Sequence, residues 1–213
     1  KNINHESNKV LHEKVRYEIL KRFGYFVTES SEHFAEYVPW FIKNNNKKLI
    51  EEYKIPIGEY LDRCKNYENK RQSISNVETV INLPIKKSNE YASKIMKAVL
   101  TNQDFTFNAN VQNDNLIQNL PKESVVEVPC LINSKGINPK KMGKIPVQLA
   151  AIMQTNINVQ LLTAEAALEL DKGLIYNAAM LDPHTASELS INQISNMVDD
   201  LLEAHKDYLP KYK

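Results

Sequence analysis

The sequence predicts an α+β fold in which several helices surround a small mixed or antiparallel sheet. Most segments carry apolar residues at the three- and four-residue spacing of amphipathic helices, and only two short runs have the character of strands. No linker rich in Pro or Gly divides the 213 residues, which are enough to bury a hydrophobic core. We expect a ragged polar segment at residues 1–14, followed by one domain over residues 15–213.

The first helix is expected at 16–23, because Gly24 follows it and tolerates the left-handed conformation of a helix C-terminus. Pro39 is expected to break or bend the next segment. Polar or turn-forming runs at 44–48 and 56–58 predict surface loops.

Two further helices are expected before the chain changes its periodicity. Residues 59–80 are charged and predict a solvent-facing helix, and residues 90–100 carry apolar side chains at helical spacing. Residues 104–111 then alternate apolar and polar side chains, as a strand does. A second strand is expected at 124–132, where Pro129 indicates an edge strand or a bulge.

From Pro146 onward the pattern is helical. One long apolar stripe runs from Leu149 to Ala166, and the polar group at 156–158 is its one candidate interruption. Thr185-x-x-Glu188 and Ser190-x-x-Gln193 both match the capping box, in which side chains satisfy the first backbone amides of a helix. An amphipathic helix is expected after Ser190.

The composition argues against several classes of protein. The net charge is +1 and no basic run alternates with aromatic residues, so nucleic acid and anionic membrane surfaces are not expected partners. No apolar stretch approaches the roughly 18 residues of a membrane span, and the N-terminus lacks the features of a signal peptide. The two cysteines are far apart and predict no disulfide framework, which favours a cytoplasmic location. The chain contains neither GxGxxG nor GxxxxGK, so it carries no nucleotide-binding fingerprint.

The segment 16–43 concentrates ionisable side chains. Glu29, Glu32, His33 and Glu36 stand at offsets of 0, 3, 4 and 7, and would share one face of a helix. Three carboxylates beside an imidazole shift one another's pKa values, which favours an added cation or a metal ion. The alternative is a solvated helix face with an internal His–Glu pair. The spacing leaves both interpretations open.

Five blocks carry a family resemblance. They are GYFVTESSEHFAEYVPWF at 24–41, LPI and EYA within 83–92, NLPKESVVEVPCL at 119–131, PVQLAAIMQTNINVQLLTAEAAL at 146–168, and AAMLDPHTASELSINQISNMVDDLLEAH at 178–205. In this order they closely resemble the C-terminal half of family 4 glycoside hydrolases, in particular the α-galactosidase (melibiase) branch.

The resemblance implies an unusual chemistry. Members of this family look like lactate and malate dehydrogenases, with an N-terminal Rossmann domain for NAD and an α+β C-terminal domain that completes the sugar pocket. They cleave glycosides by redox and elimination, with a divalent metal ion, usually manganese. The expected partners are an α-galactoside, the missing N-terminal Rossmann domain and further copies of the chain in a homo-oligomer. We expect no glycosidase turnover from this chain by itself.

The resemblance also implies roles for particular residues. Tyr25 stands where the family has its tyrosine base, although the alternative is a half-buried aromatic residue with a hydrogen-bonded hydroxyl. Glu32 and His33 are expected to line the pocket or bind sugar hydroxyls. Asn110 is assigned as a further donor to the sugar, within a group that includes Asn108 and Asn113.

The metal assignment rests on a weaker match. Residues 2–5 partly match the family's Gly-hydrophobic-Asn-His metal motif, which makes His5 the candidate metal ligand. In the alternative, His5 is a chance match on a disordered terminus. No residue of this chain is assigned to NAD. The functional alternative to a glycosidase half is a non-catalytic module for oligomerisation or sugar binding.

Overall fold

The computed structural model describes residues 13–73, 88 and 90–213, which fall into two compact units. The first unit takes its described residues from Lys1–Ile55, Asn108–Cys130 and Pro139–Lys213, and the second from Pro56–Phe107 and Leu131–Asn138. Each unit is described by itself. The assignment of residues 15–213 to a single domain stays a prediction.

Two helices come first in the described part of the first unit. Helix α2 spans Lys14–Phe23 and ends at Gly24, whose φ of +79° is left-handed and whose amide donates a hydrogen bond to Leu20 O at 2.9 Å. This confirms the expected helix end. Helix α3 spans Ser31–Tyr37, and Ser30 Oγ caps it by accepting the His33 backbone N–H at 3.2 Å.

The chain turns at Pro39 after α3, as expected, and then forms helix α4 at Lys47–Tyr53. The loop expected at 44–48 is therefore too long by two residues, because the helix already begins at Lys47. A loop at 56–58 is confirmed.

A hydrophobic core joins these three helices. Its buried members are Val15, Ile19, Ala35, Val38, Phe41 and Ile55. Ile152, from the long helix that follows the sheet, packs against this cluster. The rings of Phe41 and Tyr53 meet edge-to-face with 4.9 Å between their centroids. Removal of a buried aromatic side chain such as Phe41 typically costs roughly 3–5 kcal/mol, so this core fixes the relative positions of α2, α3 and α4.

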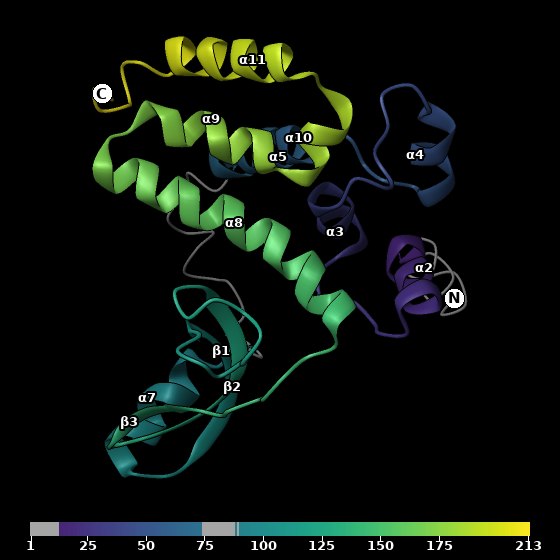
Figure 1. Ribbon diagram of the computed structural model, residues 1–213. Coiled ribbons are helices and arrows are strands. Elements are labelled where there is room, and N and C mark those ends of the chain that lie inside the picture. Colours follow the sequence, from purple (N-terminus) through teal and green to yellow (C-terminus); the bar gives the residue numbers. More distant parts are fainter. Residues whose placement is uncertain (1–12, 74–87, 89) are drawn as a thin grey trace. The chain divides into compact units, whose positions relative to one another are not determined.

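The C-terminal part of the first unit consists of four helices and a short tail. Its elements are α8 (Val147–Glu169), α9 (Lys172–Leu181), α10 (Pro183–Glu188) and α11 (Ile191–Ala204). Helix α9 lies against α8 and α11 against α9 (Figure 1). Helix α8 is continuous through 156–158, so the candidate interruption does not occur. Among the helices described, none has the length and apolar character needed to cross a membrane.

One of the two expected capping boxes exists. Ser190 and Gln193 form a complete box at the start of α11, with Ser190 N–H donating to Gln193 Oε1 at 2.9 Å. The expectation for Thr185 is wrong. Asp182 caps α10 instead, accepting the Thr185 N–H at 2.7 Å, because Pro183 occupies the first helical position and starts the helix earlier.

The sheet has three antiparallel strands in the order β1-β2-β3, which confirms the predicted fold class. Strands β1 (Phe105–Gln112) and β2 (Val125–Asn133) match the two expected runs, whereas β3 (Gly136–Pro139) is too short for its pattern to be recognised in the sequence. Pro129 lies in the central strand, so the expectation of an edge strand is wrong. The reason is local. Pro129 O accepts the N–H of Lys140 at 2.8 Å, so the side of Pro129 that lacks an N–H faces the chain just beyond the end of β3 and not the β3 ladder itself.

Two more helices lie in the described part of the second unit. Helix α5 (Glu59–Ser73) buries none of its described side chains, which confirms a solvent-facing helix over these residues; 74–80 lie outside the described residues. Helix α7 (Ala92–Thr101) confirms the helix expected near 90–100. The Tyr91 ring packs against Phe107 at 5.5 Å.

Candidate functional site

The turn between α2 and α3 presents Tyr25 to solvent. Gly24 reverses the chain, and Tyr25 and Phe26 follow it with 47% and 45% of their surface exposed. Arg16 fixes this turn from α2: its Nε donates to Val27 O at 2.8 Å, and its guanidinium lies 4.2 Å from the centre of the Phe26 ring. The Tyr25 side chain is therefore exposed on a segment whose backbone is held in place.

A second set of contacts joins the two helices. Arg16 also forms an ion pair with Glu13, 3.0 Å between Nη1 and Oε2, and its backbone N–H donates to the buried Ser31 Oγ at 3.3 Å. Sequence reasoning did not single out Arg16 or Glu13. Their three-residue spacing on a helix, next to an aromatic turn, is the signal that would have found them.

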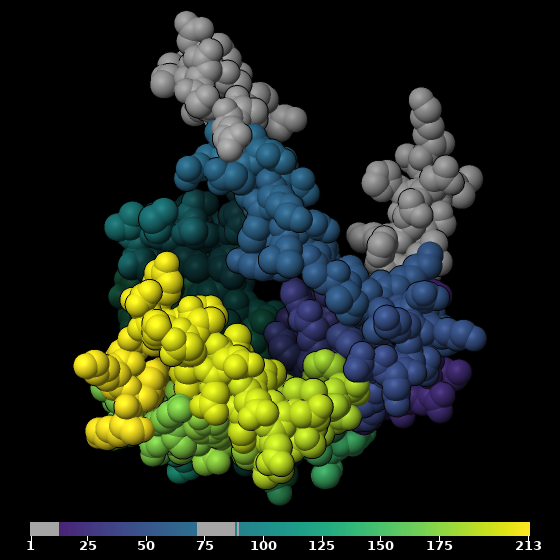
Figure 2. Space-filling view, turned by 90° about the horizontal axis from the view of Figure 1, so that it is seen from above, coloured from purple at the N-terminus to yellow at the C-terminus, as the bar shows by residue number. Residues whose placement is uncertain are grey.

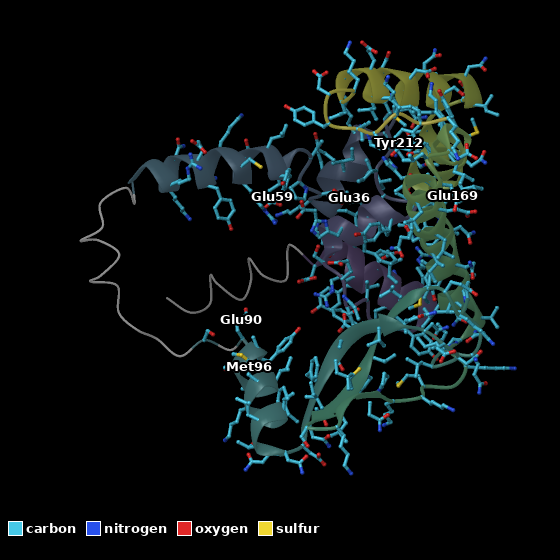
Figure 3. The ribbon with its side chains drawn as sticks, turned by 90° about the vertical axis from the view of Figure 1, so that its left-hand side faces the viewer. Glu36, Glu59, Glu90, Met96, Glu169 and Tyr212 are labelled. Carbon is cyan, nitrogen blue, oxygen red and sulfur yellow. The ribbon has the colours of Figure 1, made fainter. Side chains whose placement is uncertain are left out.

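Helix α3 carries an ion pair on its surface. His33 Nδ1 lies 3.2 Å from Glu36 Oε2, and this hydrogen bond is the main cause that raises the pKa of the His33 imidazole. Partial burial lowers that pKa, whereas the charges of Glu36, Glu32 and Glu29 raise it further. Figure 3 labels Glu36 on this helix.

The expectation that four ionisable residues share one helical face is wrong for Glu29. Glu29 precedes the helix and its Oε1 accepts the Ser30 backbone N–H at 2.8 Å. Over the described part of the chain, no group of three or more His, Cys, Asp or Glu side chains is arranged to hold a metal ion. The geometry therefore favours the interpretation of a solvated helix face with an internal His–Glu pair.

The C-terminal end of α3 is held from α8. Asn156 Nδ2 donates to Tyr37 O at 3.3 Å. Partial burial is the main cause that raises the pKa of the Tyr37 phenol, followed by the charges of Glu29 and Glu36. Tyr37 is thus an exposed tyrosine close to these carboxylates, and its hydroxyl favours the protonated form.

The asparagines on and just after β1 separate into two roles. Asn110 is exposed on β1, on the strand face opposite Ala109 and Val111. Asn113, in contrast, is fully buried, and its Nδ2 donates to the carbonyls of Ile117, Leu120 and Pro121 at 2.9, 3.1 and 3.0 Å. Asn113 therefore stabilises its own turn and has no free donor for a sugar.

Glu32 and His33 lie together on α3, and Tyr25 lies on the turn that leads into it. The grouping of Asn110 with these residues stays a prediction. His5, the candidate metal ligand, lies outside the described residues.

An apolar hollow that the sequence did not predict lies in the C-terminal helices. It has a volume of about 550 Å³ and is lined by α8, α9 and α11 together with Tyr208, Leu209 and Tyr212 of the C-terminal tail. The tail is tied down by Lys213, whose N–H donates to Leu170 O at 2.7 Å. Figure 2 shows α11 and the tail, in yellow, on the surface of the chain, and Figure 3 labels Tyr212 beneath α11.

Comparison with known proteins gives a consistent picture. The family model described as family 4 glycosyl hydrolase C-terminal domain matches residues 1–185. An alpha-galactosidase of Bacillus subtilis (strain 168) is 52% identical over 206 residues, covering 95% of this chain and 47% of the relative. An alpha-galactosidase of Rhizobium meliloti (strain 1021) is 31% identical over 209 residues, covering 94% of this chain and 43% of the relative. The chain thus spans about half the length of these relatives.

Solved structures share the fold. A putative glucosidase lplD from Bacillus subtilis superposes with a TM-score of 0.77 at 23% identity, over 88% of this chain and 42% of that one. A 6-phospho-alpha-glucosidase from gut microorganisms, in complex with NAD and Mn²⁺, gives a TM-score of 0.70 at 17% identity, over 93% of this chain and 43% of that one.

Proposed function

The chain belongs to the family 4 glycosyl hydrolases, as their C-terminal domain, and from this premise we propose that it is the sugar-binding half of an enzyme that hydrolyses O-glycosyl bonds. The proposed substrates are α-galactosides. The observation that carries this proposal is the 52% identity to an alpha-galactosidase over 95% of the chain. Because the match covers only 47% of that relative, we propose that activity requires an N-terminal Rossmann domain as partner.

We propose that NAD and a divalent metal ion serve this enzyme, as one related structure holds both NAD and Mn²⁺. We propose that this chain holds neither group by itself. The sequence contains no glycine-rich dinucleotide fingerprint, and the described residues contain no set of metal ligands. NAD, when bound, would supply reversible hydride transfer. His5 is the proposed single contribution of this chain to the metal site.

Residues on the turn and on α3 are proposed to bind and orient the sugar. The raised pKa of His33 shifts its balance toward the imidazolium form, which can donate a hydrogen bond from Nε2 to a hydroxyl while Nδ1 faces Glu36. Glu32 and Asn110 are proposed as further hydroxyl partners.

Tyr25 is the proposed general base. Its exposure, together with the fixed backbone of its turn, lets a substrate approach the phenol. A phenol with an ordinary pKa of about 10 needs a neighbouring positive charge to act near neutral pH. We propose that this charge comes with the completed site.

A complementation experiment tests the proposal. The purified chain is incubated with nitrophenyl α-galactoside, NAD, Mn²⁺ and a reductant, alone and together with the separately expressed N-terminal half of the Bacillus subtilis relative. We expect turnover only from the mixture, and its loss after addition of EDTA. Turnover by this chain alone, or by the N-terminal half alone, would contradict the proposal, and so would an inactive mixture whose halves co-elute.

The apolar hollow among α8, α9 and α11 favours a second candidate, a non-catalytic module for oligomerisation. Leu201, Tyr208 and Leu209 line the hollow and are 50%, 88% and 37% exposed, so apolar surface gathers there as it does at protein interfaces. Multi-angle light scattering separates the candidates. A monomer at high concentration argues against assembly, and galactoside binding that needs neither NAD nor metal would instead indicate a sugar-binding module.

A further inference from the structure

Glu188, on α10, binds the segment that leaves α3 although the two are far apart in the sequence. Its Oε1 lies 2.9 Å from Lys43 Nζ, and its Oε2 accepts the backbone N–H of Asn44, also at 2.9 Å. Ser187 Oγ accepts a further hydrogen bond from Lys43 Nζ at 2.9 Å. Both oxygens of the carboxylate are therefore engaged, one by a charged donor and one by the backbone.

This contact is about as covered as the Arg16–Glu13 pair and is less exposed than the ion pair at the end of α11. The side chains of Lys43 and Glu188 are only 27% and 16% exposed. In contrast, Glu203 on α11 is 73% exposed and its partner Lys206, just after that helix, is 61% exposed. Reduced solvent screening makes such a pair worth more than an exposed one. Because Glu188 also accepts the backbone N–H of Asn44, the contact restrains the main chain and not only a side chain.

The segment between α3 and Lys43 is rigid enough to transmit this restraint. Val38 and Phe41 are 2% and 5% exposed and share the core with Ala35 of α3. Helix α10 contacts α3 directly, and Asn156 holds the Tyr37 carbonyl from α8. The end of α3 is thus fixed by its own core residues and by polar contacts from two C-terminal helices.

We propose that Glu188 is a positioning residue for the sugar-binding face of α3 and acts through Lys43 and Asn44. This inference rests on the proposed function, because it assigns Glu188 to the same site. In this role, contacts from the helices that follow the sheet set the orientation of His33 and Glu36 on α3.

The charges around Glu188 are consistent with this role. The Lys43 ammonium is the main cause that holds the pKa of the Glu188 carboxyl below its ordinary value, the Asn44 N–H is the next, and His184 adds a smaller contribution. Ser187 is the remaining polar neighbour. The carboxylate therefore stays charged over the neutral range, and the contact does not depend on a protonation event there.

Amide hydrogen exchange on the intact chain tests the proposal. We expect Glu188→Ala to raise the exchange rates of Asn44 and of the α3 amides about tenfold, and to leave those of α11 unchanged. Glu188→Gln should have a smaller effect, because its amide oxygen can still accept the Asn44 N–H. Glu203→Ala is the matched control, since it removes an ion-paired carboxylate on α11 that is remote from α3.

A second measurement separates positioning from local stabilisation. The His33 titration is followed by NMR, with His33→Gln used to assign its signal. We expect Glu188→Ala to move the His33 pKa toward its ordinary value and Glu203→Ala to leave it unchanged. An unmoved His33 titration, or an increase in exchange that is uniform or confined to residues 43–46, would overturn the proposal. Both measurements use the chain without substrate, so a failed complementation experiment would overturn the glycosidase proposal separately.

Discussion

His33 Nδ1 and Glu36 Oε2 lie 3.2 Å apart on the exposed side of α3, with 43% and 50% of the two side chains accessible to solvent. The pair is internal to the helix, so it needs no metal ion to balance its charges. Its effect on the chain is to favour the imidazolium form of His33, and this gives the first prediction.

Glu36→Gln is expected to lower the pKa of His33 toward the ordinary value of about 6.5, because the hydrogen bond to Glu36 is the largest cause of the increase. The pKa is higher in the folded than in the unfolded chain. The pair therefore stabilises the folded chain fully at pH values below the pKa of His33 in the unfolded chain. This stabilisation is lost as the pH rises through the pKa of His33 in the folded chain.

Because the pair is solvent-exposed, we expect the free energy of unfolding of wild type and Glu36→Gln to differ by only about 0.3–0.5 kcal/mol near pH 6. This difference should vanish near pH 8. NMR titration measures the pKa of His33, and urea unfolding at both pH values measures the difference in the free energy of unfolding. A difference that grows as the pH rises would show that another group is responsible.

Gly24→Ala should destabilise the chain by about 1 kcal/mol, because Gly24 has a φ of +79° and a Cβ disfavours this conformation. No atom lies within 4 Å of the position of the added Cβ, so the cost is conformational and not steric. Gly24→Asn is the matched variant and should cost less, since Asn tolerates the left-handed region better. Equal losses for both variants in thermal unfolding would contradict this explanation.

Asn113→Ala should cost about 3 kcal/mol or more, because it leaves buried backbone groups without partners. The Nδ2 donates to three carbonyls and the Oδ1 accepts the Ile117 N–H at 2.7 Å. Asn110→Ala is the control: it lies on the exposed face of β1 and should leave the free energy of unfolding unchanged. Chemical denaturation measures the free energy of unfolding of both variants. Similar losses of stability for Asn113→Ala and Asn110→Ala would contradict the different roles given to these residues.

These two asparagines show what the sequence could and could not predict. Alternation along β1 correctly predicts that Asn110 faces away from Ala109 and Val111, since local periodicity fixes which face a side chain takes. The role of Asn113 depends on a turn whose carbonyls converge on one side chain, and no periodic pattern encodes that convergence.

The same distinction holds for α3. The four-residue pattern allowed an internal His–Glu pair as one of two interpretations, but it could not show that Ser30 caps the helix and leaves Glu29 outside it. Long-range contacts were beyond pattern reasoning altogether. Glu188 and Lys43 are separated by most of the chain, and only the packing of α10 on α3 brings them together.

Ser190→Ala should destabilise the chain by about 1 kcal/mol, because Ser190 accepts the Gln193 N–H and completes a capping box. Thr185→Ala should have little effect on the α10 cap, although its sequence pattern looks the same, since Asp182 is the capping residue there. The expected decrease in Tm is about 2–4 °C for Ser190→Ala. Calorimetry on both variants tests this, and an equal decrease for Thr185→Ala would show that the sequence pattern was right after all.

Tyr25→Phe tests the proposed base directly in the complemented enzyme. We expect kcat to fall by roughly 100-fold or more, because removal of a general base typically has an effect of that size, while Tm stays within about 1 °C, since Tyr25 is 47% exposed. Tyr37→Phe is the matched control: Tyr37 is 44% exposed, and partial burial together with Glu29 and Glu36 raises the pKa of its phenol and favours the protonated form. If Tyr37→Phe lowers kcat and Tyr25→Phe does not, the base lies on α3. If neither does, proton abstraction belongs to the partner domain and this chain contributes only binding.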